Sequence, residues 1–337
     1  MDSVKPKVKL GIEIRKLSPA AGGVVAGSSS ASTPFLLPEG EVKFKEEDLL
    51  FAEELGHGAG GSVAKVVHIP SGAVMARKHL SVNVDAEQDR RKAERNLKNE
   101  LKILHKCRSE YIVSSFGAFV HDGGVSVVME YMDLGSLEFI YKTFGPIAEA
   151  VVAKVAVRTL KGLVYLQEMN IVHRDIKPSN LLVNTLGQVK IADFGVSKEL
   201  VNTQARTFTG TQGYLAPERI QFGTSYSVVS DVWSLGLTLM EVATGEFPYN
   251  GKGLVISDGA EMSLFDLIAC INDHPSPQLP EGKFSKDFEE LIALCVIKDH
   301  TVRPGPDAVL QQKSCVAAEA DGCNILDWAQ SLNQQLQ

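Results

Sequence analysis

The chain has 337 residues, 44% of them apolar and 22% charged, and this balance excludes an intrinsically disordered protein. A formal net charge of -7 argues against a surface built mainly for nucleic acid, so we expect no nucleic-acid partner. The five cysteines are odd in number and lack CxxC spacing, and no apolar run approaches the roughly 18 residues of a membrane span. We therefore expect no membrane partner and a cytoplasmic location, with the nucleus as a second compartment.

The first 48 residues differ from the rest of the chain in composition. The stretch from Ala20 to Thr33 consists almost entirely of Ala, Gly, Ser and Val, which is typical of a flexible tether. Ahead of it, basic residues precede the spaced apolar pair Leu10 and Ile12. These basic residues are Lys5, Lys7 and Lys9. Such a stretch is either a docking peptide or a solvated tail, and the sequence leaves both open.

A glycine-rich stretch, LGHGAGGSV, occupies residues 55–63. Its GxGxxG spacing fits a dinucleotide-binding turn that opens a helix as well as a phosphate-binding hairpin between two strands. The segment that follows, Val63 to Ile69, is rich in β-branched residues and is typical of a strand. We therefore predict a hairpin whose backbone can approach phosphates. Its residues are Leu55, Gly56, His57, Gly58, Ala59, Gly60, Gly61, Ser62 and Val63.

A lysine and a carboxylate form the next candidate pair. Lys78 lies at the end of a second apolar strand-like run. Residues 85–105 lack Gly and Pro and are rich in Glu, Lys, Arg and Leu, so a helix is expected there. Glu100 lies on the apolar face of this helix, and no basic residue stands three or four positions from it. A carboxylate in that position needs a partner, and we predict that Glu100 pairs with Lys78.

The stretch HRDIKPSNLLVNTLGQVKIADFG, residues 173–195, holds two carboxylates and an amide that suit phosphoryl transfer. That reaction asks little covalent chemistry of a protein, because the work lies in orienting a hydroxyl and neutralising phosphate charge with Mg²⁺. Asp175 can serve as the base, and Asn180 and Asp193 as metal ligands. Two short apolar runs separated by a turn predict a pair of strands that carry these residues at their ends.

The order HRDxKxxN followed by DFG is similar to the catalytic and metal-binding loops of protein kinases. A closer resemblance, to the mitogen-activated protein kinase kinases, is carried by Asp193 to Ser197, Pro217 to Gln221 and Tyr226 to Gly236. This resemblance implies an α+β, bilobal protein-kinase fold, with a small β-rich N-lobe at about 49–130 and a larger helical C-lobe at about 134–316. The kinase domain is then expected at 49–316, after a tail at 1–48 and before a C-terminal extension at 317–337.

The same resemblance implies ATP and Mg²⁺ as cofactors and gives each site residue a role. Lys177 would steady the γ-phosphate, and Lys78 would contact the α- and β-phosphates. The segment that follows the strand-like run 125–129 would be the hinge that binds adenine, with Met129 beside the base and the backbones of Glu130 and Met132 at its edge. The residues expected around adenine are Val63, Ala76, Met129, Glu130, Met132 and Leu182.

The segment after the DFG motif contains two threonines four residues apart, Thr203 and Thr207. The resemblance implies that an upstream mitogen-activated protein kinase kinase kinase phosphorylates both, and that Arg174 pairs with the phosphorylated loop. It also implies an ion pair between Glu218 and Arg303.

The resemblance further implies a downstream mitogen-activated protein kinase as the substrate, modified on Thr and Tyr, and a scaffold as a further partner. The basic–apolar stretch near the N-terminus would dock this substrate. The apolar residues Ile325, Leu326 and Trp328 near the C-terminus, which we expect in a short amphipathic helix, would recruit the upstream kinase.

Two other interpretations remain open at this point. One is a Ser/Thr kinase of the same wider group that acts higher in the cascade. The other is a catalytically silent, kinase-like scaffold, which would typically lack one of the four residues Lys78, Asp175, Asn180 and Asp193. All four are present, and this favours an enzyme.

Overall fold

A computed structural model describes residues 44–58, 61–81, 107–121, 124–193, 213–220, 227–249, 264–320 and 324–337. All of them belong to one unit of the chain, Gly40–Gln337. Among these residues, no helix is both long and apolar enough to cross a membrane. The predicted helix at 85–105, with Glu100 on it, lies outside the described residues, as do Thr203, Thr207 and nearly all of the N-terminal tail.

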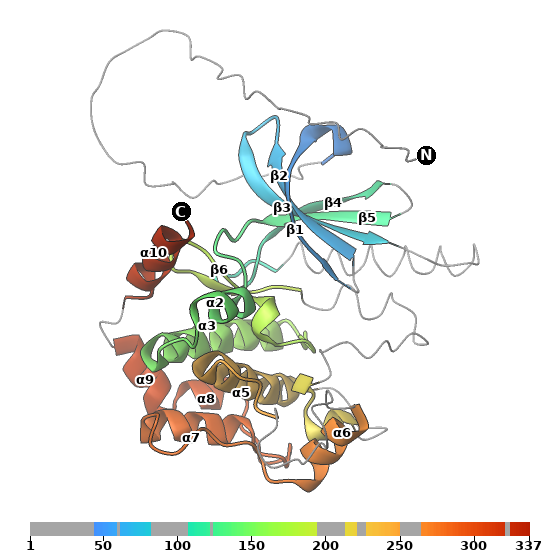
Figure 1. Cartoon of the computed structure of the whole chain (residues 1–337). Helices are drawn as coiled ribbons and strands as arrows, with labels where there is room; N and C mark the ends of the chain where they lie inside the picture. The colour runs from blue at the N-terminus through green and yellow to red at the C-terminus, as the bar shows by residue number, and fades with distance from the viewer. Residues whose placement is uncertain are drawn as a thin grey trace, which may run out of the picture. The chain divides into compact units, whose positions relative to one another are not determined.

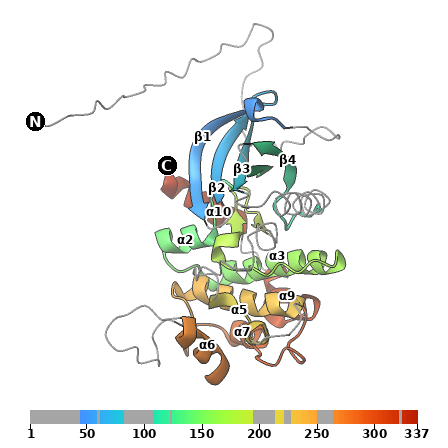
Figure 2. The ribbon, with the colours of Figure 1, turned by 90° about the vertical axis from the view of Figure 1, so that its right-hand side faces the viewer.

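An antiparallel sheet of five strands forms the first part of the fold, in the order β1-β2-β3-β5-β4 (Figure 1). The strands are β1 Leu49–Gly58, β2 Gly61–His68, β3 Ala73–Ser81, β4 Ser115–His121 and β5 Gly124–Glu130, and the short 3-10 helix η1 Glu46–Asp48 precedes β1. The first three strands lie side by side as long curved ribbons (Figure 2). Strand β5 pairs on both edges, with β3 and β4, and its residues from Gly124 to Val128 are buried.

The glycine-rich stretch forms the hairpin that the sequence predicts. Strand β1 pairs with β2 through to Gly58 and Gly61. Gly61 has a φ of 124°, and a Cβ built on it would lie 1.8 Å from the carbonyl oxygen of His79 on the neighbouring strand. Only glycine fits this backbone conformation and this approach.

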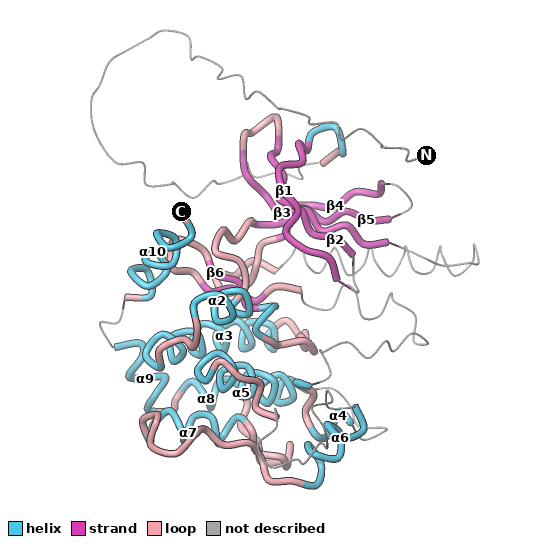
Figure 3. Tube along the Cα trace, in the orientation of Figure 1, coloured by secondary structure: helices cyan, strands magenta, loops and turns pink. Residues whose placement is uncertain are grey.

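Helices make up most of the second part of the fold, and Figure 3 contrasts them with the strands. They are α2 Leu137–Phe144, α3 Glu149–Glu168, η2 Pro178–Asn180, α4 Pro217–Ile220, α5 Val228–Thr244, α6 Leu264–Asp273, α7 Lys286–Cys295, α8 Pro306–Leu310, α9 Lys313–Ala320 and α10 Ile325–Leu336. The antiparallel pair β6 Leu181–Val183 and β7 Val189–Ile191 interrupts this helical series.

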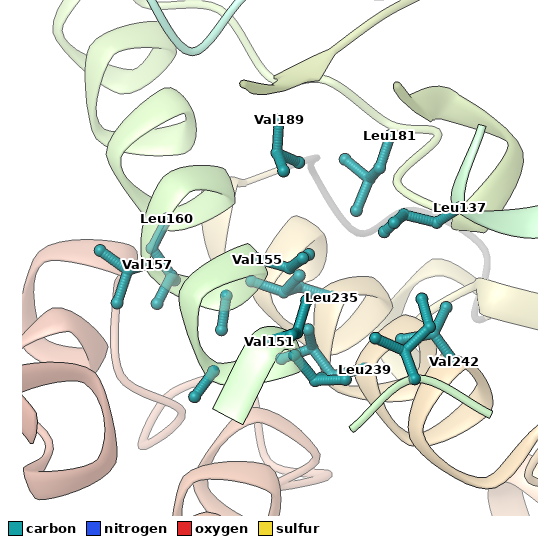
Figure 4. Close-up of a cluster of buried hydrophobic side chains, with 14 of the residues drawn as sticks. Leu137, Val151, Val155, Val157, Leu160, Leu181, Val189, Leu235, Leu239 and Val242 are labelled. Atoms are coloured by element: carbon teal, nitrogen blue, oxygen red, sulfur yellow. The ribbon is translucent and has the colours of Figure 1, made fainter. Parts of the chain in front are cut away.

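The main hydrophobic core lies where α3 packs against α5 and the β6–β7 pair (Figure 4). Helix α5 is mostly apolar, and its residues from Ser230 to Ala243 are buried, as expected of a helix that is enclosed on every side. Leu235 and Leu239 on α5 and Leu160 on α3 are inaccessible to solvent. Each fully buried leucine stabilises the fold by roughly 1.5–3 kcal/mol. This core provides a rigid base for the loops described next.

The segment between the two parts of the fold is tied to the β6–β7 pair. Tyr111, ahead of β4, accepts a hydrogen bond from the Ile191 backbone at 2.9 Å, and Val113 donates one back to Ile191 O, also at 2.9 Å. Leu134, directly after the predicted hinge, donates to Val183 O at 3.2 Å. The predicted strands at 181–183 and 189–191 are therefore present, and they connect the sheet to the helical part.

Two of the predicted boundaries fall inside the described structure. Phe44 is buried and η1 begins at Glu46, so folded structure is already present before the predicted boundary at position 49. The division at 316 falls within helix α9, and the predicted C-terminal helix corresponds to α10.

Candidate active site

The loop from His173 to η2 brings three predicted catalytic and metal-binding residues together. Asn180 donates its amide Nδ2–H to the backbone oxygen of Asp175 at 2.7 Å and to the carboxylate Oδ2 of Asp175 at 3.0 Å. Lys177 Nζ lies 3.4 Å from the same carboxylate oxygen. A base, a cation and an amide therefore stand within hydrogen-bond or ion-pair reach of one another.

A buried carboxylate on helix α5 holds this loop in shape. The backbone N–H groups of His173 and Arg174 donate to the two oxygens of Asp231, each at 2.8 Å. Burial raises the pKa of Asp231, while His173 and the two N–H donors act in the opposite direction. Arg174 has a φ of 70°, a left-handed conformation that costs an L-residue energy and that these hydrogen bonds help to maintain.

The role of Asp231 as an anchor was not predicted from the sequence. A carboxylate in a largely apolar helix could have indicated it, because such a group requires hydrogen-bond donors when it is buried. The side chain of His173 completes the support, since its Nε2 lies 2.9 Å from the carbonyl oxygen of Ala192. Ala192 precedes Asp193, so the loop of Asp175 and the loop of Asp193 are held against each other.

Asp193 contacts the predicted phosphate-binding lysine. Lys78 Nζ on β3 lies 2.6 Å from Asp193 Oδ1, and the Lys78 side chain is largely buried. The backbone of Asp193 has a φ of 59°. The predicted partner of Lys78, Glu100, lies outside the described residues, so that pairing remains a prediction. The observed contact links the sheet directly to the helical part at the predicted metal ligand.

The residues predicted around adenine fall into two connected sets. In the sheet, Ala76 pairs with Met129 across β3 and β5, and Val63 pairs with Lys78 across β2 and β3. A small apolar cluster joins Met129, Met132 and Leu182. Two of its members, Val113 and Ala192, were not predicted. They carry no local motif, and only the fold brings them there.

Backbone N–H groups of the predicted hinge lack an acceptor among the described residues, and that of Met132 is one of them. The N–H of Glu130 already donates to Ser114 O at 2.9 Å. The carbonyl of Met132 accepts from Gly135 at 3.1 Å, but the N–H of Met132 has no acceptor among the described residues. The Met132 side chain is buried, and a polar group beside such a surface is costly without a partner. This N–H is a donor that a ligand with a hydrogen-bond acceptor could use.

The glycine-rich hairpin leaves room for a ligand. A Cβ built on Gly56 would meet nothing within 4 Å, so the packing of the protein itself does not require a glycine there. The hairpin residues Leu55, Gly56, His57 and Gly58 lie on β1, and Gly61, Ser62 and Val63 lie on β2. Ala59 and Gly60 at the tip are outside the described residues.

The donor set also suits a hard divalent cation. The described residues contain no group of three or more His, Cys, Asp or Glu side chains that could hold a metal ion without help. Because Asn180 uses its NH₂ group on Asp175, its carbonyl oxygen is left for another partner. This oxygen and the carboxylate of Asp193 are the ligand types that Mg²⁺ takes from proteins, with phosphate oxygens and water completing the shell.

Comparison with known proteins agrees with this geometry. The sequence profile of the protein kinase domain matches residues 50–314. The chain is 40% identical to the dual specificity protein kinase FUZ7 of Mycosarcoma maydis, over 87% of this chain and 77% of that protein. It is 43% identical to the mitogen-activated protein kinase kinase MST7 of Pyricularia oryzae, over 88% of this chain and 71% of that protein. The chain belongs to the mitogen-activated protein kinase kinase family. The predicted bilobal kinase fold is confirmed, and ATP and a divalent cation are the cofactors that a protein kinase domain implies.

The kinase also contains the predicted ion pair between Glu218 and Arg303. Arg303 binds both carboxylate oxygens of Glu218, at 2.8 and 3.1 Å, and Ser230 donates to the same carboxylate at 2.8 Å. Both side chains are almost inaccessible to solvent. Burial opposes ionisation of Glu218, but the hydrogen bonds and charge of Arg303 outweigh it and lower the pKa of this carboxyl.

A second buried carboxylate in the kinase was not predicted. Glu241 on α5 accepts hydrogen bonds from the hydroxyl groups of Tyr141 on α2, at 2.6 Å, and of Tyr214, at 2.5 Å. Burial raises the pKa of Glu241. Ser234 also donates to the carbonyl of Tyr214 at 2.7 Å. These contacts fix the segment that leads into α4. As with Asp231, a carboxylate in a largely apolar helix is the sequence feature that could have indicated this contact.

Proposed function

We propose that this kinase transfers the γ-phosphate of ATP to Thr and Tyr in the activation loop of a downstream mitogen-activated protein kinase, and that phosphorylation of Thr203 and Thr207 switches it on. The observation that carries the proposal is the contact of Asn180 with Asp175, beside a loop that ends in the Lys78–Asp193 pair. The names of the two relatives support the substrate class and the specificity for both hydroxyl types.

In this proposal Asp175 orients the substrate hydroxyl and takes its proton as the oxygen attacks the γ-phosphorus. A new oxygen–phosphorus bond forms, and the bond from the γ-phosphorus to the bridging oxygen of ADP breaks. Lys177, next to Asp175, steadies the transferred group by its charge. Asn180 and Asp193 would hold Mg²⁺, which when bound neutralises charge on the phosphates.

The nucleotide would lie between the two sets of residues described above. The adenine ring would pack among Val63, Ala76, Met129 and Leu182, and the unused N–H of Met132 would donate to its edge. Lys78 would divide its charge between Asp193 and the phosphates. Glu100 would then hold the lysine from the helix outside the described residues.

Regulation by phosphate is supported by two guanidinium groups that interact near the catalytic loop. Burial, followed by the charge of Arg174, lowers the pKa of Arg219 on α4 to about 10, while the carboxylates of Asp231 and Glu218 act in the opposite direction. In this proposal a phosphate would be a further anion near both arginines. Phosphorylated Thr203 or Thr207 would supply that anion.

The proposed partners are an upstream kinase kinase kinase, the downstream substrate and a scaffold, in the cytoplasm and the nucleus. The docking stretch with Leu10 and Ile12 lies outside the described residues and stays a prediction. At the other end of the chain, Ile325 is buried in the main core and Trp328 packs against that core. Ile325 is therefore not available for docking while α10 is in place, and a partner that binds there would meet the outer face of this helix.

The test uses full-length protein with Thr203→Asp and Thr207→Asp, ATP, Mg²⁺ and a catalytically inactive mitogen-activated protein kinase with a Thr-x-Tyr loop. Mass spectrometry of the substrate should find phosphate on both hydroxyl types, and the alanine pair at 203 and 207 should transfer much less. Phosphate on Ser or Thr proteins alone would favour the kinase higher in the cascade. Binding of the substrate without transfer would favour the scaffold.

A further inference from the structure

Strand β7 carries a buried lysine that the proposed reaction does not use. The ammonium group of Lys190 lies 2.6 and 2.8 Å from the two carboxylate oxygens of Glu130. Only 8% of the Lys190 side chain is exposed. A lysine is rarely buried to this extent unless it is paired, because its charge is costly to remove from water. The contact therefore fixes both side chains.

The partner of this lysine is the first residue of the predicted hinge, and several contacts hold it. Glu130 exchanges hydrogen bonds with Ser114, ahead of β4: its N–H donates to Ser114 O at 2.9 Å, and its Oε2 accepts from Ser114 N at 3.2 Å. The next hinge residue, Tyr131, has Lys65 Nζ of β2 at 4.9 Å from its ring centroid. Both contacts precede Met132, whose N–H has no acceptor in the part of the chain that the structure describes.

Lys190, the other partner of this ion pair, lies close in sequence to the proposed metal ligand Asp193. Lys190 stands three residues before Asp193 on a strand fixed from both directions. Ile191 is bonded to Tyr111 and Val113, and the N–H of Ala192 donates to Asn180 O at 2.8 Å. A series of contacts therefore connects Glu130, through Lys190 and a short strand, with the residue before Asp193.

We propose that Lys190 is a positioning residue that holds the hinge at a fixed distance from Asp193, so that adenine and the metal-bound phosphates of one nucleotide are recognised together. The inference rests on the proposed function, because it requires that ATP binds at the hinge. Lys190 touches neither substrate nor nucleotide in this account, and acts through Glu130 and Asp193.

Adenosine and ATP with Mg²⁺ should respond differently to loss of the contact between Lys190 and Glu130. Adenosine engages the hinge alone, whereas ATP with Mg²⁺ must satisfy the hinge and Asp193 at the same time. Loss of the link should therefore weaken ATP with Mg²⁺ by about tenfold and change adenosine affinity by less than about threefold, since binding energy from two tethered contacts depends on their geometry. A merely structural defect at the hinge would weaken both ligands equally.

The experiment measures the dissociation constants of ATP with Mg²⁺ and of adenosine for full-length protein carrying Lys190→Met, Lys190→Arg or Glu130→Gln. Lys190→Arg keeps the charge and should retain most of the affinity for ATP. Glu130→Gln keeps the shape of the side chain and removes its charge, so it should lose ATP affinity as Lys190→Met does. It replaces Lys190→Met as the test if that variant does not fold. Lys142→Met is the matched control, because Lys142 makes an exposed pair with Glu138 at the same 2.6 Å. It should change neither constant.

Equal weakening of both ligands, or ATP affinity within about twofold of the unaltered protein in the lysine and glutamate variants, would overturn the positioning role. Failure of the proposed function at the nucleotide site has a different signature, because the unaltered protein would then bind ATP with Mg²⁺ no more tightly than it binds adenosine, and failure of phosphate transfer is read separately in the transfer assay described above. The melting temperature of each variant shows whether it is folded.

Discussion

Asn180 performs two tasks with the two ends of one amide group. Its NH₂ group donates to Asp175, which fixes the proposed base, and this leaves its oxygen for the cation. A carboxylate at position 180 could ligate a metal but could not donate to Asp175. The amide is therefore the side chain that serves both the base and the metal, and this accounts for asparagine here.

Replacement of Asn180 by alanine should affect both tasks. We expect the Mg²⁺ concentration for half-maximal transfer to rise about tenfold or more, because one ligand and one orienting contact are lost together. The maximal rate should also fall. A magnesium titration of initial rates measures both effects. Asn333→Ala on α10, which makes no contact with Asp175 that is described here, is the control. An unchanged magnesium requirement in Asn180→Ala would contradict the assignment.

At the residue scale, the sequence predicts what is local and misses what is distant. Asp175, Lys177 and Asn180 lie within six consecutive positions, so their spacing alone indicates a shared site, and the structure brings them together. Asp231 is 58 residues from His173, and Lys190 is 60 residues from Glu130. Neither pairing leaves a periodic pattern in the sequence, because only the folded chain brings the partners together.

The ion pair between α4 and the segment before α8 should make stability depend on pH. The pKa of Glu218 is held below its ordinary value of 4.5, so the folded protein binds a proton there less readily than the unfolded chain does. The contribution of this pair to the free energy of unfolding is thus complete above about pH 4.5 and is lost as the pH falls through the lowered pKa.

Glu218→Gln should consequently lower the melting temperature most at neutral pH, where the loss leaves Arg303 buried without its counter-charge, at a cost of about 3–5 kcal/mol. The difference from the unaltered protein should narrow as the pH falls below about 4.5 and through the lowered pKa of Glu218, because the native carboxyl also becomes protonated over that range. Thermal unfolding between pH 3.5 and pH 8 tests this. A difference that stays constant with pH would show that the charge of Glu218 is not what stabilises the segment.

Close packing between α5 and α7 gives a second prediction for an element. A Cβ built on Gly236 would lie 2.7 Å from Cys295 Cβ and 2.8 Å from Val296 Cγ1. Alanine favours an exposed helix by about 1 kcal/mol over glycine, but overpacking a core costs about 1–3 kcal/mol.

Gly236→Ala should therefore destabilise the protein by about 1 kcal/mol or more in a denaturant titration, with the overpacking cost exceeding the helix gain. Gly56→Ala is the control for stability, because a Cβ there meets nothing within 4 Å. If Gly236→Ala is more stable than the unaltered protein, then α7 can move away from α5 at little cost.

At the scale of elements, the short strands β6 and β7 and the hairpin of β1 and β2 follow from their apolar runs and turn residues. The order of the five-stranded sheet does not, because β5 inserts between β3 and β4. A pattern with a period of two predicts a strand but carries no information about its neighbour. The two-lobed architecture was predicted from the resemblance to kinases and not from the hydrophobic periodicity.

On the scale of the whole molecule, the site is assembled from both parts of the kinase fold. Lys78 comes from the sheet and Asp193 from the loop that follows β7, and the two meet at 2.6 Å. The ion pair of Glu130 and Lys190 is a second contact between the sheet and the helical part. Catalysis therefore depends on how the sheet is positioned relative to the helical part. We propose that phosphorylation of Thr203 and Thr207 controls this positioning.

The most direct measurement compares nucleotide binding with phosphate transfer in one variant, Asp175→Asn, in protein that also carries Thr203→Asp and Thr207→Asp. The account predicts that transfer to the downstream kinase falls by about 10²–10⁴-fold, because the amide cannot accept the proton of the substrate hydroxyl. The dissociation constant for ATP with Mg²⁺ should stay within about threefold, since Asp175 contacts Asn180 and Lys177 but not the hinge. Transfer that persists near the unaltered rate would contradict the assignment of the base and, with it, the proposed site.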